Sequence, residues 1–367
     1  MTALHRREAS TWRALLSLGT AAALIAPQQR RTRARLHAES KYWSHDGVDV
    51  HYAIEQATEP SDAVVVFGPG FGAGAFQFAD VCRHVANGGV DAIAMDWLGQ
   101  GRSWPEDDLT GRNFGVETWI SQLTAFVEQL DYSKVYVAGN SIGGLVAASV
   151  AARSDCVKGC ALLNPTPFWS FWGVNGCPLW NGDLPGPGPF EAFGAAWFDA
   201  LRDEKTVQSL LRQVYAAPER ADAQLARDIC TSASHPNGPR VFSSILFAGR
   251  AKDEFDDVMR RLGEKDLETY LVYGREDPWV RPIWGQRASR RYAEGGTVAP
   301  YYELSPAGHC VHHEAPGAVA ACVLRLVRGV DVPVSVREAH GPTVAIEARG
   351  AAAPRGVLER VALSAWG

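Results

Sequence analysis

Long hydrophobic runs are missing from this 367-residue sequence, which has no stretch of the ~20 uninterrupted apolar residues that a membrane-spanning helix needs. The seven cysteines are odd in number and scattered, and no C-x-x-C pair occurs, which argues against a disulfide framework and a zinc site. We therefore expect free thiols in a reducing compartment. The mature protein is expected to be soluble or only peripherally attached to a membrane.

Outside the first 38 positions, basic residues are outnumbered by acidic ones. Seven arginines and one glutamate give that segment a charge of +6, which leaves −11 for the rest of a chain whose formal net charge is −5. Nucleic-acid phosphates need a basic surface, so the acidic body argues against a nucleic-acid partner.

The arginine-rich segment 1–38 has the composition of an organelle transit peptide. Within it, residues 14–26 form an apolar run of signal-peptide length that follows several arginines. Three interpretations stay open: a plastid transit peptide, a two-part leader in which a signal sequence precedes a transit segment, and an N-terminus without an address. The first two predict a chloroplast protein.

The body of the chain alternates between strand and helix patterns. A hairpin signal at 42–53 surrounds Asp46-Gly47. Apolar strand patterns cover residues 63–67, 90–95, 134–138, 157–163, 269–273 and 300–304, and helical patterns cover 76–85, 116–130 and 142–152. Strands that alternate with helices build βαβ units, so we expect an α/β fold with a mostly parallel sheet flanked by helices.

The alternation breaks once, in a segment that holds no buried strand pattern. It begins with a stretch rich in Trp, Phe, Pro and Gly and continues with helical patterns at 207–215 and 223–231. An insertion of this length in a sheet fold is usually a lid or a second domain. The predicted organisation is a leader (1–38), a core (39–166 and 268–329), a largely helical lid (167–267) and an irregular tail, with at most a stray hairpin (330–367).

A candidate nucleophile follows the strand pattern at 134–138. Gly139-Asn140-Ser141-Ile142-Gly143 is a G-x-S-x-G motif between a strand and a helix, the context of the nucleophile elbow of α/β-hydrolases. Small glycines leave room for a strained turn that exposes the serine hydroxyl near the positive end of a helix. The motif alone is common, and an ordinary strand-to-helix turn is the other interpretation. The strand–motif–helix context favours Ser141 as the nucleophile of a serine esterase.

An acid and a base should follow this serine in the order Asp/Glu then His. Asp277 comes after a late strand, with Glu276 as the alternative, and His309 comes before the last helix. His312 and His313 are rivals for the base, but they fit the start of a helix better. A histidine must remove the serine proton, and a carboxylate must orient that histidine.

The oxyanion hole of such a site uses two backbone N–H groups. We assign them to Ile142, directly after the serine, and to Phe71 in the glycine-rich loop 68–72, where Pro69 has no N–H to donate. No G-K-[ST] follows that loop, so it is not a phosphate loop. The loop 96–103 is expected to have a structural role. The histidines near Cys310 lack a matching ligand set elsewhere, so no metal is expected.

Several segments together resemble one family. They are PGFGAGAF (69–76), DWLGQGRSWP (96–105), AGNSIGG (138–144), LLNPTPFW (162–169), YGREDPWVRPIWG (273–285) and PYYELSPAGHC (300–310). The chain resembles the pheophytinases, plastid α/β-hydrolases of chlorophyll breakdown. That resemblance implies hydrolysis of the phytyl ester of pheophytin to pheophorbide and phytol without a cofactor. It also implies a pigment substrate, peripheral contact with the thylakoid, and other enzymes of chlorophyll breakdown as candidate partners.

The chain departs from the family pattern at Ile142, Val311 and His313, where Leu, Pro and Asp are expected, and in its long C-terminal tail. No catalytic group is lost. Aromatic side chains crowd the start of the predicted lid, and a flat macrocycle with an isoprenoid tail needs such walls. The candidate substrate-binding residues are Phe168, Trp169, Trp172 and Trp279.

Two other functions stay open at this point. The chain has the features of a lid-bearing esterase or lipase that acts on another apolar ester, including magnesium-bearing chlorophyll. A pigment-binding protein that has lost catalysis is disfavoured by the complete set of Ser141, Asp277 and His309. An aspartate nucleophile, as in dehalogenases and epoxide hydrolases, is excluded because serine stands at that position.

Overall fold

The computed structural model describes residues 38–106, 114–167, 189–246, 248 and 251–349. The strands are β1 (Glu39–His45), β2 (Val48–Glu55), β3 (Ala63–Gly68), β4 (Asp91–Met95), β5 (Lys134–Asn140), β6 (Val157–Leu163), β7 (Glu268–Gly274), β8 (Tyr301–Ser305), β9 (Ser335–Arg337) and β10 (Thr343–Arg349). The core helices are η1 (Ala75–Phe78), α1 (Ala79–Asn87), α2 (Val116–Glu128), α3 (Ile142–Arg153), α8 (Phe255–Glu264), α9 (Pro282–Ala293), α10 (Val311–Glu314) and α11 (Pro316–Arg328). Between β6 and α8 lie α4 (Pro189–Leu201), α5 (Glu204–Val214), η2 (Pro218–Arg220), α6 (Ala223–Ser232) and α7 (Gly238–Leu246).

The described strands form one ten-stranded sheet in the order β1-β2-β4-β3-β5-β6-β7-β8-β10-β9. Neighbouring strands from β4 to β8 pair in parallel, and both edges of the sheet are antiparallel. The α/β fold with a mostly parallel sheet is therefore confirmed. The hairpin signal is confirmed as well, because Asp46 and Gly47 between β1 and β2 both have positive φ angles (49° and 74°).

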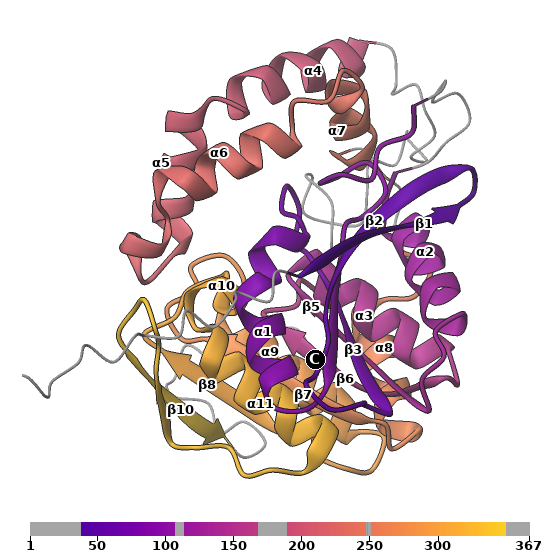
Figure 1. The fold of residues 1–367 in the computed structure, drawn as a ribbon, viewed down its shortest axis with the longest axis vertical. Coiled ribbons are helices and arrows are strands. Elements are labelled where there is room, and N and C mark those ends of the chain that lie inside the picture. Colours follow the sequence, from indigo (N-terminus) through magenta and orange to yellow (C-terminus); the bar gives the residue numbers. More distant parts are fainter. Residues whose placement is uncertain (1–37, 107–113, 168–188, 247, 249–250, 350–367) are drawn as a thin grey trace, which may run out of the picture. The chain divides into compact units, whose positions relative to one another are not determined.

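Helices cover both faces of the sheet, as parallel strands with fully apolar sequences require. In β3 every residue is buried, and successive side chains alternate between two cores. One core contains residues of α2, α3, α8 and α9, and the other contains residues of α1 and α11. Figure 1 shows α1 and α11 side by side, and they are in direct contact.

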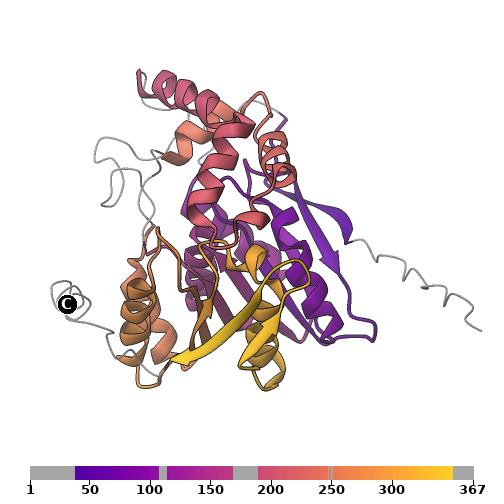
Figure 2. The same ribbon diagram turned by 90° about the vertical axis from the view of Figure 1, so that its left-hand side faces the viewer.

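The helices α4 to α7 lie together at one end of the described body (Figure 1 and Figure 2). Two of them begin where the sequence supplies a cap: Asp203 accepts a hydrogen bond from the N–H of Thr206, and Asp222 accepts one from Leu225. We call the four helices with η2 the lid helices. Some of their residues form two small apolar clusters, whereas Val241 and Ile245 of α7 belong to a buried core of the sheet.

The predicted boundary of the insertion at residue 267 is wrong. α8 lies inside the predicted lid range, but it packs against α3 and α9. Its apolar residues Phe255, Val258 and Met259 belong to the same buried core as the sheet. The strongly amphipathic pattern of this helix matches a layer that covers a sheet on one side.

Of the two possibilities given for the tail, irregular structure or a stray hairpin, the described part forms a hairpin that joins the sheet. β10 pairs antiparallel with β8, and β9 pairs with β10, so the tail extends the sheet by two strands. Val344 and Ile346 alternate with exposed residues and bury their side chains in the core of α1 and α11. Pairing with β8, which no local pattern reveals, stabilises this hairpin.

A glycine near the end of β5, Gly139, allows a test of how tightly this fold is packed. A Cβ atom at Gly139 would lie 2.2 Å from the backbone oxygen of Gly143. We expect Gly139→Ala to lower the free energy of unfolding by about 3 kcal/mol or more, because backbone cannot move as a side chain can. Gly341→Ala is the matched control, since its new methyl group would make an ordinary 3.5 Å contact. Equal stability of the two variants in urea denaturation would contradict the packing argument.

Candidate active site

Ser141 lies at the sharp turn between β5 and α3. Its φ of 56° and ψ of −120° are outside the regions that side chains usually prefer, as expected for a nucleophile elbow. A Cβ atom at Gly143 would lie 2.2 Å from the carbonyl oxygen of Gly68, so the elbow packs directly on the loop that follows β3. Glycine is thus required at 143 because two backbone segments meet there.

The structure brings His309 and Asp277 together, although 31 residues separate them in the chain. Nδ1 of His309 lies 2.7 Å from Oδ2 of Asp277, and both side chains are buried. The carboxylate accepts the Nδ1 proton, which leaves Nε2 unprotonated and able to act as a base. Oδ1 of Asp277 accepts hydrogen bonds from the backbone N–H groups of Trp279 and Val280 at 2.8 and 3.0 Å.

The rival residues occupy other positions. Glu276 accepts hydrogen bonds from Ser305 Oγ and the Ala307 N–H, so it does not pair with His309. His312 stacks on Phe78, with ring centroids 4.1 Å apart, and burial lowers its pKa well below the usual value. The structure therefore places Asp277 and His309, among the candidates, in the acid–base arrangement.

Two asparagines that the sequence analysis did not assign support this pair. Asn164, at a φ of 43° after β6, donates to Oδ2 of Asp277 at 2.7 Å and accepts from the N–H of Gly274 at 3.0 Å. Asn140, beside the nucleophile, donates to the carbonyl oxygen of His309 at 2.9 Å. Asn140 is the last residue of β5 and Asn164 directly follows β6, so both lie at the carboxyl ends of parallel strands, near the candidate site. A polar residue at the carboxyl end of a strand was the sequence signal that could have identified them.

The glycine-rich loop after β3 lies against the nucleophile. A Cβ atom at Gly70 would lie 3.4 Å from Cβ of Ser141, so Phe71, the next residue, is placed close to the reaction centre. The loop 96–103 holds this segment, because Trp97 donates to the oxygen of Pro69 at 2.8 Å and Gln100 accepts from the N–H of Gly72 at 2.7 Å. Ile142 is buried at the first turn of α3. Their roles as oxyanion donors stay predictions.

An apolar cavity joins this loop to the lid helices. Phe71, Trp104, Phe198, Phe242 and Ile245 contribute to its wall. The cavity is thus lined by the predicted oxyanion loop on one side and by α4 and α7 on the other. Its accessible volume is about 50 Å³.

The four residues predicted to bind substrate fall into two groups. Trp279 is 59% exposed, and its ring centroid lies 5.4 Å from that of His309. It therefore lies exposed beside His309, and its role in substrate binding stays a prediction. Phe168, Trp169 and Trp172 lie outside the described residues, so their assignment stays a prediction.

The loop that carries the base is also bound to the lid. The N–H of His309 donates to the carbonyl oxygen of Val214, the last residue of α5, at 2.8 Å. The buried carboxylate of Glu314 accepts from the N–H groups of Ala216 and Ala217 and from that of Gly308. Burial raises the pKa of Glu314 to about 7, and these three donors oppose the rise. We call these contacts the lid–base clamp.

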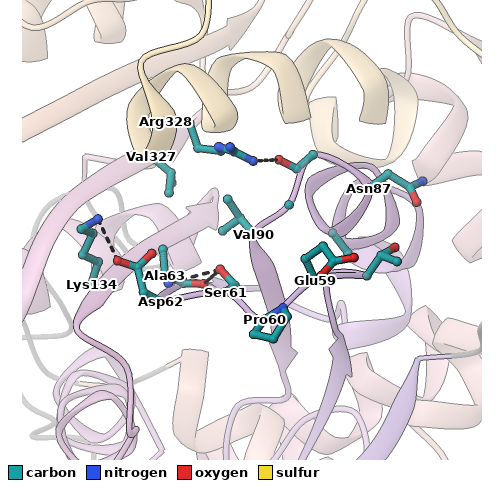
Figure 3. A pocket seen from close by; sticks show the side chains of 14 residues that line it. Glu59, Pro60, Ser61, Asp62, Ala63, Asn87, Val90, Lys134, Val327 and Arg328 are labelled. Carbon is teal, nitrogen blue, oxygen red and sulfur yellow. Dashed lines mark hydrogen bonds and ion pairs between the residues drawn. The ribbon is translucent and has the colours of Figure 1, made fainter.

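A wider cavity, of about 700 Å³, lies at the other end of the parallel strands, where β3 and β5 begin (Figure 3). It is lined by the first residues of β3 and β5, and Figure 3 shows the ion pair of Lys134 with Asp62 at its rim. Ser141, Asp277 and His309 all follow the carboxyl ends of their strands. This cavity is therefore remote from the candidate site.

The described residues contain no group of three or more His, Cys, Asp or Glu side chains arranged to hold a metal ion. Within the same ranges, no helix is long and apolar enough to cross a membrane. The cysteines at 82, 156, 160, 230, 310 and 322 form no disulfide with one another.

Removing the amide of Asn164 should weaken the acid–base pair. Asn164→Ala takes one donor from Asp277 and one acceptor from Gly274, and a hydrogen bond to a charged group contributes about 1.5–3 kcal/mol. We expect the rate at which a fluorophosphonate probe labels Ser141 to fall about tenfold or more. Asn87→Ala, at the exposed end of α1, is the control. Unchanged labelling of Asn164→Ala would show that Asp277 needs no such support.

The lid–base clamp should make stability depend on pH. Folding raises the pKa of Glu314 from 4.5 to about 7, so the unfolded chain binds fewer protons in that window. The stability that wild type has relative to Glu314→Gln should then fall as pH rises from 4.5 to 7, by on the order of 3 kcal/mol, and level off above. Urea denaturation of both proteins between pH 4.5 and 8 measures this. A difference that does not change with pH would contradict it.

Comparison with known proteins agrees with this geometry. A sequence model of the Alpha/beta hydrolase family matches residues 65–322. Pheophytinase, chloroplastic, from Arabidopsis thaliana is 33% identical over 308 residues, which are 74% of this chain and 62% of that protein. The chain thus aligns with less than two thirds of that relative, and the predicted resemblance to the pheophytinases is confirmed. A 2-hydroxy-6-oxononadienedioate/2-hydroxy-6-oxononatrienedioate hydrolase from Pseudomonas putida is 25% identical over 64% of this chain and 77% of its own length.

Solved structures show the same fold at low sequence identity. A serine hydrolase involved in carbazole degradation superposes with a TM-score of 0.60 at 17% identity, over 80% of this chain and 100% of its own. An enol-lactonase from Burkholderia xenovorans LB400 also gives 0.60, at 19% identity, over 78% and 99%. Because the family match covers most of the chain and includes Ser141, Asp277 and His309, the protein is a hydrolase that belongs to the alpha/beta hydrolase family.

Proposed function

We propose that the protein is a serine esterase with Ser141 as nucleophile, His309 as general base and Asp277 as the residue that orients the base. The observation that carries this proposal is the buried 2.7 Å contact of His309 Nδ1 with Asp277 Oδ2, in a family whose elbow serine stands at Ser141. With its Nδ1 proton held by the carboxylate, His309 has Nε2 available to accept a proton.

The reaction has two halves. His309 takes the proton of Ser141 while Oγ attacks the ester carbonyl carbon, and the same proton then goes to the departing alcohol oxygen. A water molecule, deprotonated by His309, next attacks the acyl-enzyme and releases the acid. The backbone N–H groups of Phe71 and Ile142 stabilise the negative oxygen in both halves, and one such donor typically contributes about 3 kcal/mol.

We infer that the substrate is the phytyl ester of pheophytin, cleaved to pheophorbide and phytol. Similarity to the Arabidopsis pheophytinase over 74% of the chain supports this substrate class. A chloroplast location follows from the same proposal.

Pigment hydrolysis tests both the machinery and the substrate. Wild type, Ser141→Ala and Ser149→Ala are incubated with pheophytin a and with chlorophyll a in detergent, and the products are separated by chromatography. Ser149 is the control because it lies in α3 with a buried hydroxyl that has no hydrogen-bond partner. We expect pheophorbide from wild type and Ser149→Ala, and a loss of at least about 10³-fold in Ser141→Ala.

Other results would change the proposal in different ways. Chlorophyllide as the main product would keep the esterase and reject the preference for magnesium-free pigment. No product from either pigment, with fluorophosphonate labelling of Ser141 intact, would reject the pigment substrate while keeping the nucleophile. Product formation by Ser141→Ala at the wild-type rate would reject the assignment of the nucleophile.

A further inference from the structure

A second chain of serine, histidine and aspartate lies at the edge of the sheet formed by β1, β2 and β4. Oγ of Ser40 is 2.7 Å from Nε2 of His51, and Nδ1 of His51 is 2.7 Å from Oδ2 of Asp96. These residues lie on β1, on β2 and directly after β4, and Figure 1 shows β1 and β2 as a neighbouring pair. None of them is among the residues assigned to the first site.

The hydrogen-bond partners are compatible with a serine and its base. Nη1 of Arg102 is 3.3 Å from Oγ of Ser40, and a guanidinium group can only donate. The Ser40 hydroxyl has two lone pairs and one proton, so it can accept from Arg102 and at the same time donate to Nε2 of His51. The carboxylate of Asp96 accepts the Nδ1 proton of His51, and a neutral imidazole that carries its proton there has Nε2 free to accept. This is the protonation pattern of a serine with its base and its orienting acid.

Backbone hydrogen bonds fix the orientation of the Asp96 carboxylate, as an acid that orients a histidine requires. The N–H of Ala75 donates to its Oδ1 at 2.7 Å, and the N–H of Arg102 donates to its Oδ2 at 2.9 Å. Asp96 and His51 are only 2% and 5% exposed. Protein donors therefore satisfy the carboxylate in its ionised form, and the imidazole is kept in one orientation.

Ser40 itself is exposed, and it opens on a cavity of about 400 Å³ that His51, Asp96 and Arg102 also line. Four alanines and one phenylalanine make up much of the remaining wall (Ala53, Ala75, Phe76, Ala79 and Ala94). Neither Ser141 nor His309 lines this cavity. The nucleophile, the base and a cation thus meet at a space large enough for a small molecule.

We propose that Ser40, His51 and Asp96 form a second acyl-transfer site, with Arg102 as the group that stabilises the oxyanion. His51 Nε2 takes the Ser40 proton while Oγ bonds to the acyl carbon, and the imidazolium returns that proton to the departing alcohol. Water then attacks the acyl-serine, with His51 as base, and releases a carboxylic acid. No oxidant, metal or cofactor is needed.

The side chains that line this cavity indicate which class of substrate would fit. Its alanine-rich wall suits a short acyl group rather than a phytyl-sized tail. The carboxyl groups of Glu55 and Asp228 also line it and would repel an anionic substrate. Small neutral esters are therefore the substrates that fit, and this assignment does not depend on the pigment proposed for Ser141.

Labelling in a background without the first nucleophile tests the second site. The full-length Ser141→Ala protein is treated with a fluorophosphonate probe and digested, and the modified peptide is identified by mass spectrometry. We expect an adduct on Ser40 that forms at least about tenfold faster than in the heat-unfolded protein, and slow turnover of p-nitrophenyl acetate. Adding Ser40→Ala should abolish both, whereas adding Ser44→Ala, another exposed serine of β1, should change neither.

Two results would overturn the proposal. One is the absence of a Ser40 adduct in folded Ser141→Ala, and the other is labelling of Ser40 at the rate of the unfolded protein. Either would mean that the three residues only tie β1 to β2 and β4. Because Ser40 is exposed, its replacement by alanine leaves the core intact, and circular dichroism of each variant verifies this.

Discussion

The buried carboxylate of Asp277 is the interaction on which the candidate site depends. It accepts four hydrogen bonds, from the side chains of His309 and Asn164 and from the backbone of Trp279 and Val280. Loops after three different strands therefore meet at two oxygen atoms. An ionised carboxylate without these donors would be costly to bury, so the loops and the charge stabilise one another.

The backbone of His309, the proposed base, is held in place by both the core and the lid helices. Asn140 holds the carbonyl oxygen of His309 from the core side, and Val214 holds its N–H from the lid side. The buried Glu314 adds contacts with the backbone of both. A change in the position of α5 would therefore also move the backbone of His309. The lid helices thus help to position the proposed base.

The two serine–histidine–aspartate groups each contain a 2.7 Å contact between a histidine Nδ1 and an aspartate Oδ2, but the surroundings of the two serines differ. Ser141 occupies a strained turn, whereas Ser40 lies on an extended strand at the sheet edge. A backbone loop lies against Ser141, and an arginine side chain lies against Ser40. The same acid–base relation can arise from unrelated positions in a chain because only the relative placement of three groups matters. The loop 96–103 serves both places, since Trp97 and Gln100 hold the loop at 69–72 while Asp96 orients His51.

The sequence by itself determined the parts of this protein that are encoded locally. Apolar runs with alternating helices predicted the parallel sheet, and Asp46-Gly47 predicted the turn of its first hairpin, because period and turn chemistry are local properties. The G-x-S-x-G motif predicted the elbow for the same reason. Tertiary structure alone decided the pairing of β10 with β8 and the place of α8 in the core. The sequence favoured Asp277 over Glu276, and the structure places Asp277 beside His309. Tertiary structure also brought Asn164 to Asp277 and Ser40 to His51, since these contacts join residues whose distance in space no local pattern records.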